Sequence, residues 1–224
     1  MMITVCSAYA QDRGVFFRED FNDLHNWRPI YFPKIQRHST YTILSDDSDH
    51  CLKTESNDSA SAIVCKLTYN VYQYPLLKWR WKVDNVYKKG NATTKAGDDY
   101  PLRIYVLFKY DPDKASIAQR ILYEAAKLIY GEYPADSSLN YVWANKPEKE
   151  AILPSPVTNR VEMVMLEEGL NVGKWVDEDV NVLKDYKRAF GHGPPSVATI
   201  GIMNDSDNTG ESSTSYLKYI EIYR

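Results

Sequence analysis

Short segments in which apolar and polar residues alternate recur along the chain and constrain its fold more than any other feature. Residues 74–86 place Trp79, Trp81 and Val83 on one face and basic residues on the other, and residues 102–110 alternate similarly. A period of two is that of a half-buried β-strand. Roughly nine or ten such segments, separated by turns, predict an all-β-dominated, antiparallel β-sandwich of the jelly-roll type. The main expected strands are residues 39–46, 50–56, 61–71, 74–86, 102–110, 139–145, 158–169, 194–204 and 213–224, and imperfect alternation allows a β-bulge in the last.

Two inserted short helices interrupt this β pattern. The first is expected within residues 111–134, where Asp111 can cap the helix and Pro112 suits its first position. One face of this helix is apolar, and we expect that face to dock on the sandwich. The second is expected over residues 180–190, ended by Gly191. The apolar positions of the first helix are Ile117, Ile121, Ala125 and Leu128.

The composition narrows the class of protein. The 224 residues carry a formal net charge of −3 and contain no block of Lys and Arg, which argues against nucleic acid as a partner. No apolar run approaches the ~20 residues of a transmembrane helix. The 18 Tyr and 5 Trp fit either a β protein or an aromatic-lined binding face. Residues 11–224 contain neither a repeat nor a linker and are expected to form one β-sandwich domain, of unassigned oligomeric state.

The start of the chain indicates export. Ala8-Tyr9-Ala10 fits the small-x-small pattern of signal-peptide cleavage, so residues 1–10 are interpreted as a residual signal-peptide segment and the protein as periplasmic or secreted. An oxidising compartment permits a disulfide. A hairpin folded at Asp58 would place Cys51 opposite Cys65 and allow a bridge between them, whereas a slip of register would separate the two sulfurs.

Two polar clusters lie at strand ends, where the loops of a sandwich gather and binding groups are common. One precedes the strand at residues 102–110 and the other follows the strand at residues 194–204. We expect Asp98 or Asp99 of the first cluster to lie close to Asp205 or Asp207 of the second. The clusters comprise Lys95, Asp98 and Asp99, and then Asn204, Asp205, Asp207, Asn208 and Thr209.

These clusters are open to several interpretations. Paired carboxylates could serve glycoside hydrolysis, which makes Asp98, Asp99, Asp205 and Asp207 the catalytic candidates. Asp205 and Asp207 could instead bind calcium through oxygen ligands, although no cofactor at all and a simple Asx-rich turn are alternatives. Bracing of the loops by Arg–Asp pairs is a further alternative. The remaining candidate binding residues are Arg80, Arg103 and Tyr105, which could line a cleft, and Trp143, which could stack on a sugar.

Several motifs taken in order resemble a bacterial family catalogued as domain of unknown function 3047. They are "EDFND", "WRWKV", "KAGDDYPLRIYVLF", "LNYVWAN", "IGIMNDSDNTG" and "YLKYIEIYR". The resemblance implies an exported bacterial protein and carries no established activity. The opening "EDF" and closing "YIEI" strands also resemble, distantly, carbohydrate-binding jelly rolls, in which the end strands often pair and calcium can sit beside them.

The function we expect is carbohydrate binding, with polysaccharide as the partner, through a polar and aromatic cleft at the strand ends. The first alternative is a polysaccharide-cleaving hydrolase or lyase that uses the same Asp, Arg and Tyr residues. In the lyase, Tyr105 would transfer the proton and Arg103 would neutralise the uronate. The second alternative is a non-catalytic structural protein of the cell envelope, which would expose a large apolar patch.

Overall fold

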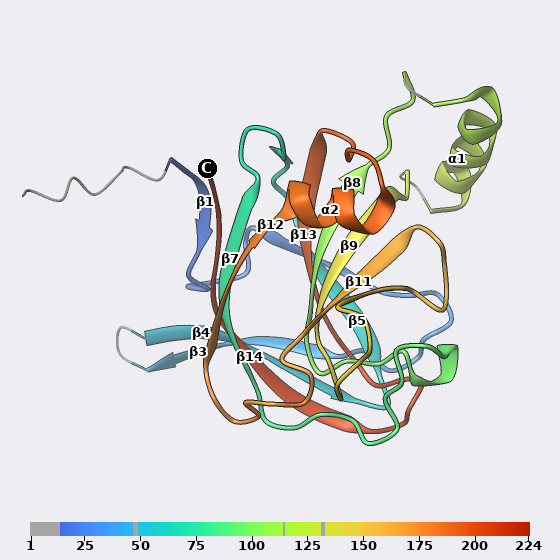
Figure 1. Ribbon diagram of the computed structural model, residues 1–224. Helices are drawn as coiled ribbons and strands as arrows, with labels where there is room; N and C mark the ends of the chain where they lie inside the picture. Colours follow the sequence, from blue (N-terminus) through green and yellow to red (C-terminus); the bar gives the residue numbers. More distant parts are fainter. Residues whose placement is uncertain (1–13, 47–48, 114, 131–132) are drawn as a thin grey trace, which may run out of the picture.

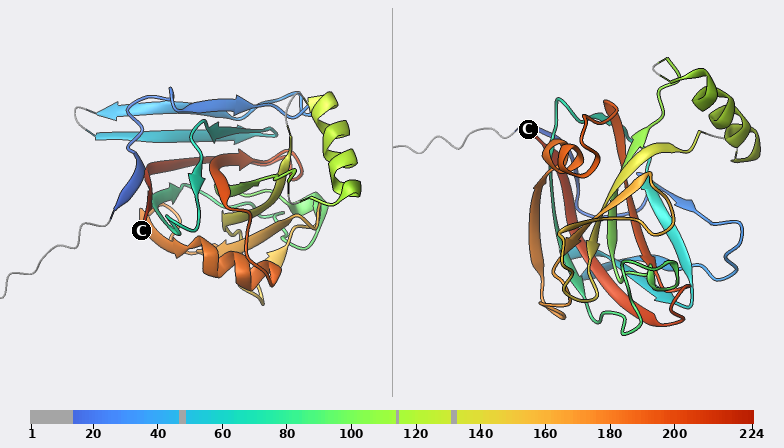
Figure 2. Two further views of the ribbon diagram at one scale, coloured as in Figure 1. Left: turned by 90° about the horizontal axis from the view of Figure 1, so that it is seen from above. Right: turned by 45° about the vertical axis from the view of Figure 1, so that its right-hand side comes forward.

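Two β-sheets packed face to face form the body of the protein (Figures 1 and 2). The computed structural model describes residues 14–46, 49–113, 115–130 and 133–224. In these residues one sheet has six strands and the other eight. The predicted β-sandwich with two inserted helices is therefore confirmed. The six-stranded sheet runs, in spatial order, β12 (Val176–Asn181), β7 (Leu76–Val83), β14 (Ser212–Tyr223), β4 (Asp49–Asn57) and β3 (Thr40–Asp46), with β1 (Val15–Glu19) paired to β14.

The eight-stranded sheet contains Arg103, Tyr105 and Asp205, three of the predicted site residues. It is mixed rather than antiparallel, because β11 runs parallel to β9 while β10 pairs with the far side of β11. Strands β2, β6 and β10 span four residues or fewer and leave little alternation for sequence analysis to detect. The order is β10 (Ile152–Pro154), β11 (Val161–Leu166), β9 (Ala135–Trp143), β8 (Arg103–Lys109), β13 (Val197–Asp205), β5 (Ala60–Cys65) and β2 (Trp27–Ile30), with β6 (Tyr69–Asn70) paired to β13.

Aromatic side chains form the centre of the core between the sheets. Trp79 and Trp81 of β7 are fully buried, as their shared face predicts. Trp79 contacts Tyr141 with ring centroids 5.4 Å apart, and Trp81 contacts Trp143 at 5.3 Å. The inward-facing side chains of both sheets thus interlock into one apolar layer, and burial of such large rings dominates the stabilisation of the fold.

The two ends of the described chain meet in one sheet. β1 pairs antiparallel with β14, which is the pairing that the likeness to jelly rolls implies. The register of β14 against β7 shifts between Leu217 and Tyr219, so the expected β-bulge is present. Residues 1–10, which the sequence predicts to be a residual signal-peptide segment, lie outside the described residues.

The predicted disulfide is wrong in this structure, in which Cys51 and Cys65 are free thiols. The turn at Asp58 has φ of +48° and sends the chain from one sheet to the other, so β4 and β5 do not form a hairpin. Cys51 is paired with Leu44 of β3, whereas Cys65 is paired with Trp27 of β2. Burial raises the pKa of both thiols and keeps them protonated at neutral pH.

The two helices dock differently from one another. α2 (Val182–Phe190) buries Val182 and Tyr186 and ends at Gly191 in the left-handed conformation, as predicted. α1 (Ile117–Tyr130) lies outside the two sheets at one end of the sandwich (Figures 1 and 2). No helix in the described parts of the chain is long and apolar enough to cross a membrane.

The expected docking of α1 through its isoleucine face is wrong. Ile117 is 80% exposed and Ile121 67%, while Tyr123, on a different face, is 1% exposed. The Tyr123 ring stacks on Tyr110 with centroids 3.8 Å apart, and its hydroxyl donates to the carbonyl of Ala135. The helix also begins later than predicted, because Ser116 and not Asp111 caps it through the backbone N–H of Gln119. The side chains of Ala125 and Leu128 are outside the described set.

Replacement of Ile121 with glutamine should leave the free energy of unfolding unchanged within about 0.5 kcal/mol, because an exposed side chain loses little buried area. The matched substitution Tyr123→Ala should destabilise the protein, since it removes a buried ring. Urea denaturation monitored by tryptophan fluorescence measures both effects. A large loss in Ile121→Gln together with none in Tyr123→Ala would contradict this docking mode.

Candidate functional site

Arg103 joins the two predicted polar clusters at one end of the eight-stranded sheet. β8 begins at Arg103 and β13 ends at Asp205, and antiparallel pairing of these strands places both residues at the same sheet end. The Arg103 Nε donates to Asp205 Oδ1 at 2.8 Å, and Nη2 donates to Oδ2 of the same carboxylate. Nη1 donates to Asp98 Oδ1 at 3.4 Å. This arrangement is a bidentate ion pair with a second carboxylate beside it.

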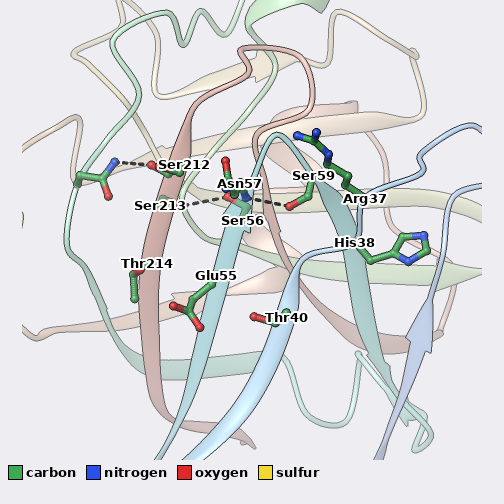
Figure 3. Close-up of a pocket in the computed structure, with 11 residues that line it drawn as sticks. Arg37, His38, Thr40, Glu55, Ser56, Asn57, Ser59, Ser212, Ser213 and Thr214 are labelled. Atoms are coloured by element: carbon green, nitrogen blue, oxygen red, sulfur yellow. Dashed lines mark hydrogen bonds between the residues drawn. The ribbon is translucent and has the colours of Figure 1, made fainter.

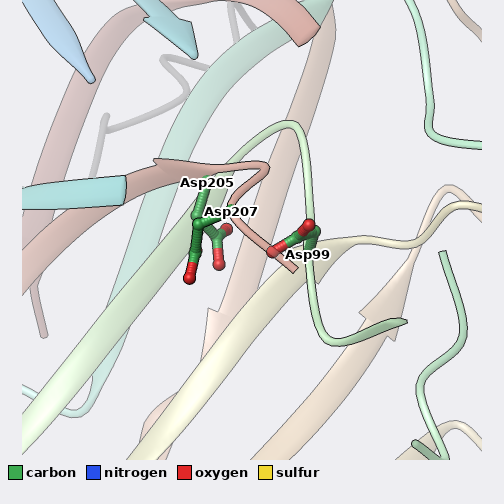
Figure 4. A group of neighbouring side chains, drawn as sticks. All are labelled: Asp99, Asp205 and Asp207. Atoms are coloured by element: carbon green, nitrogen blue, oxygen red, sulfur yellow. The ribbon is translucent and has the colours of Figure 1, made fainter. Parts of the chain in front are cut away.

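Asp99 fixes the loop that follows β13. Its Oδ2 accepts the backbone N–H of Asn208 at 3.0 Å and that of Thr209 at 2.6 Å. Carboxylate oxygens of Asp99, Asp205 and Asp207 all lie within 4.8 Å of one another (Figure 4). The structure therefore brings together the two polar segments that sequence analysis paired, and it does so through backbone and guanidinium contacts that brace the loops.

Burial dominates the electrostatics of this cluster. Asp99 is 0% exposed, Asp205 2% and Arg103 4%. Burial raises the pKa of Asp205 to about 7, and the Arg103 guanidinium opposes that rise. Burial alone would lower the pKa of Arg103, but Asp205, Tyr105 and Asp98 hold it well above its usual value. Arg103 is therefore always charged, and it is the counter-ion that permits carboxylates in the protein interior.

The chemistry open to this cluster is limited by its enclosure. Three carboxylates offer oxygen ligands of the kind calcium prefers, but Arg103 engages both oxygens of Asp205, which a cation would have to displace. Calcium binding at Asp205 and Asp207 stays a prediction. None of the four catalytic candidates lines either of the two cavities described below. Asp98, Asp99 and Asp205 are buried, so substrate access to them would need a rearrangement of the loops, whereas Asp207 is partly exposed.

Four other predicted binding residues are placed apart from a shared cleft. Arg80 lies on the six-stranded sheet, 3.7 Å from Asp177, and not on the sheet of Arg103. Trp143 is wholly buried in the core, so its predicted stacking on a sugar is wrong. Lys95 is exposed on the loop before β8. Asn204 faces inward and is fully buried. Strand alternation without knowledge of sheet membership cannot separate Arg80 from Arg103, which is why sequence analysis grouped them.

Asn204 belongs to a buried network of hydroxyl groups between the sheets. Its Nδ2 donates to Thr54 Oγ1 at 3.0 Å, and its Oδ1 accepts from Ser213 Oγ at 2.9 Å and from the Tyr87 hydroxyl at 3.3 Å. A cavity of about 630 Å³ opens beside this network (Figure 3). It is lined by Arg37, His38, Thr40, Glu55, Ser56, Asn57, Ser59, Asn85, Ser212, Ser213 and Thr214.

A larger groove of about 820 Å³ crosses the outer face of the eight-stranded sheet. Its floor contains Gly201, which is flanked by Tyr105 on β8 and Val64 on β5. Residues with small side chains form part of the groove floor, and aromatic rings line the groove beside them. The small side chains are Ala62, Ser138 and Thr199, and the rings are those of Phe32, Tyr105, Tyr110 and Tyr133.

Sequence analysis identified only Tyr105 among these groove residues. Gly201 and Thr199 lie in the strand expected at residues 194–204, and their outward positions follow from alternation. The groove floor forms because β13 pairs with both β5 and β8. This strand order depends on contacts between residues far apart in the sequence. Tyr105 also touches the buried cluster, because Arg103 Nη1 donates to its hydroxyl at 3.5 Å.

The structure leaves polar groups unsatisfied at the groove. The hydroxyl of Tyr110, which lines it, is buried and has no hydrogen-bond partner. Asn140 pairs with Tyr105 across β8 and β9, so it shares the outer face two positions from Ser138 of the groove. Its side chain is 1% exposed and does not line the groove, and neither amide atom has a hydrogen-bond partner among the described residues. Buried polar groups without partners are rare, and such a group calls for an explanation.

The family model for proteins of unknown function designated DUF3047 matches residues 25–221. The chain belongs to this family. The resemblance drawn from its sequence motifs is therefore confirmed. Membership in DUF3047 assigns no activity, and no curated protein matches the chain.

Solved structures similar to this DUF3047 member include both binding modules and enzymes. The family 11 carbohydrate-binding module from Clostridium thermocellum is 10% identical, with a TM-score of 0.45 and coverage of 92% of each chain. Endoglucanase 3 of family GH12 from Trichoderma harzianum is 10% identical, with a TM-score of 0.43 and coverage of 85% of each chain. The xyloglucanase domain of NopAA from Sinorhizobium fredii is 8% identical, with a TM-score of 0.43 and coverage of 88% of this chain and 93% of that one. None of these similarities bears on the ligand of this chain.

Proposed function

We propose that this protein binds carbohydrate in the groove across the outer face of the eight-stranded sheet. The observation that carries the proposal is the groove itself, whose volume of about 820 Å³ falls within the range of small-ligand sites. The aromatic rings that line the groove offer flat apolar surfaces on which the faces of sugar rings can stack. The export signal expected at residues 1–10 makes a periplasmic or extracellular polysaccharide the natural ligand.

An unsatisfied hydroxyl supports a ligand rich in hydroxyls. A sugar can both donate and accept hydrogen bonds, as the hydroxyl of Tyr110 on the groove lining requires. An apolar ligand would leave that hydroxyl unpaired at a cost of about 1–3 kcal/mol. The groove thus combines stacking surface with unmet hydrogen-bonding capacity, as a site for sugar rings needs.

The buried Arg103 cluster has a supporting part in this proposal. Arg103 contacts Tyr105 on the groove wall, while Asp99 and Asp205 tie the flanking loops to the same end of the sheet. Such a brace fixes the rotamer of a ring before the ligand arrives, which reduces the entropy cost of binding. Asp98, Asp99, Asp205 and Asp207 are in this view structural residues that position the site, and binding rather than cleavage is the activity.

Filling the groove floor at Gly201 tests the proposal. A Cβ added there would meet its nearest atoms at 3.4–3.7 Å, so Gly201→Ala fits with ordinary contacts. Gly201→Leu extends beyond that methyl into the groove. In affinity electrophoresis with polygalacturonate, xylan or a soluble β-glucan in the gel, at least one polymer should retard the wild type and Gly201→Ala equally. Gly201→Leu should bind at least about 10-fold more weakly, a change of ~1.4 kcal/mol.

Circular dichroism and a thermal melt establish that both Gly201 variants are folded. Folded Gly201→Leu that binds as tightly as the wild type would place the site elsewhere, with the hydroxyl-lined cavity of Figure 3 as the next location to test. Failure of every polymer to retard the wild type would favour the envelope structural alternative. Release of reducing sugar by the wild type would favour the glycan-cleaving alternative.

A further inference from the structure

The charges around the groove differ in sign from the charge of the chain. The described residues that line the groove include three Lys or Arg side chains, Arg28, Lys66 and Lys109, and no Asp or Glu. The whole chain carries a formal net charge of −3. A groove lined by cations on an acidic protein concentrates anionic ligands locally.

The described part of the chain offers neither lysine of the groove a carboxylate partner. Lys66 Nζ donates to the backbone carbonyl of His25 at 2.6 Å, which fixes the position of the ammonium group. Among the described residues, no carboxylate forms an ion pair with Lys66 or Lys109. Both are exposed at the groove margin, where a ligand can reach them.

Strand register places the third cation beside the groove floor. Arg28 of β2 pairs with Val64 of β5, and Val64 pairs with Gly201 of β13. The three residues therefore form one row across the sheet, with Tyr105 next in line. Arg28 also lines the groove, so a third basic side chain lies beside this row. A guanidinium suits a carboxylate through two parallel hydrogen bonds.

We propose that the ligand of the groove is an acidic polysaccharide whose sugar rings carry carboxylates. This inference rests on the proposed carbohydrate binding and specifies its substrate class. Uronate rings present an apolar face for Tyr105 and the neighbouring rings, hydroxyls for Tyr110, and a carboxylate for the basic residues. The mixture of apolar floor and cationic margin thus corresponds group by group to the chemistry of a polyuronate.

Binding of polygalacturonate compared with its fully methyl-esterified form tests the charge alone, because the sugar backbone is the same. By isothermal titration calorimetry the wild type should bind the ester about 10-fold more weakly, and Lys66→Gln/Lys109→Gln should bind polygalacturonate about 5-fold more weakly. Lys174→Gln, an exposed lysine before β12 on the other sheet, is the matched control and should bind as the wild type does. Binding should also weaken as ionic strength rises from about 0.01 M to about 1 M, over which the Debye length falls from roughly 30 Å to roughly 3 Å.

The outcomes separate this inference from the function on which it rests. Equal affinity for polygalacturonate and its methyl ester, or binding of a neutral β-glucan alone, would overturn the acidic-ligand inference and leave carbohydrate binding intact. Binding of dextran sulfate with none of polygalacturonate would overturn the carboxylate assignment. Absence of binding to these four polymers and to xylan would remove the proposed function together with the inference.

Discussion

Replacement of Arg103 with methionine should lower the free energy of unfolding by about 3–5 kcal/mol, because it leaves buried carboxylates without their counter-ion. Asp205 accepts two hydrogen bonds from Arg103 and is 2% exposed, and Asp98 accepts a third. In a site this buried, water cannot stabilise the carboxylates as strongly as the guanidinium does. The loss should include disorder of the loops on both sides of the sheet end, which Arg103 holds together.

Urea denaturation measures this loss, with Lys95→Met as the matched control on the exposed loop before β8. The control should change stability by less than about 0.5 kcal/mol. The double variant Arg103→Met/Asp205→Leu should lose less stability than the sum of the losses in its two single variants, because it removes the buried guanidinium and its carboxylate partner together. A loss below about 1 kcal/mol in Arg103→Met would show that the pair is not the brace described here.

Replacement of Glu178 with glutamine should change how stability depends on pH. Glu178 lies on the edge strand β12, half-buried near Glu167 and Trp81. Burial, followed by the interaction with Glu167, raises its pKa from the ordinary 4.5 to about 8. The folded state therefore holds a proton that the unfolded chain releases at much lower pH. The stability that this proton contributes is fully present below pH 4.5 and is lost as the pH rises through about 8.

The stability of the wild type should therefore fall more between acidic and alkaline pH than that of Glu178→Gln, because the glutamine side chain cannot ionise. The gap between them should be on the order of 1–3 kcal/mol above the folded-state pKa, after allowance for solvent screening of a partly exposed pair. Urea midpoints measured across the pH range provide the comparison, with the exposed Glu150→Gln as the matched control. Parallel profiles for the wild type and Glu178→Gln would show that Glu178 has an ordinary pKa in the folded protein.

Local features of this fold could be predicted from the sequence because they depend on neighbours along the chain. Alternation in residues 74–86 predicted β7 and the burial of Trp79 and Trp81. A glycine after an amphipathic run predicted the end of α2. The periodicity of α1 predicted a helix but not its docking, because the tertiary contact uses Tyr123 and leaves Ile117 exposed.

Features that depend on strand order could not be predicted in this way. Cys51 and Cys65 look like hairpin partners, yet the turn at Asp58 joins different sheets. Arg80 and Arg103 both alternate with apolar residues, and only the assembled sandwich shows that they belong to separate sheets. The groove likewise arises where β5 and β13, distant in sequence, place Ala62, Thr199 and Gly201 on one face of the sheet next to Tyr105 of β8.

Proximity of the two aspartate segments was predictable, because both adjoin core strands, but the sequence could not choose between Arg–Asp bracing of the loops and the catalytic or calcium interpretations. Sequence alone cannot show that Arg103 fills the space between Asp98 and Asp205, or that Asp99 is occupied by two backbone N–H groups. In the folded protein these residues form an Arg–Asp brace, and their catalytic and calcium-binding roles stay predictions. The site proposed here lies next to it, with Tyr105 belonging to both.

Amide chemical-shift mapping tests most directly whether the outer-face groove is the binding site. The protein would be titrated with a soluble oligosaccharide of whichever polymer retards it in affinity gels. The largest shifts are predicted at Tyr105, Thr199 and Gly201, which surround the groove floor. Shifts confined to Asn208 and Thr209, at the aspartate cluster, would contradict the assignment and return the functional site to the strand-end loops.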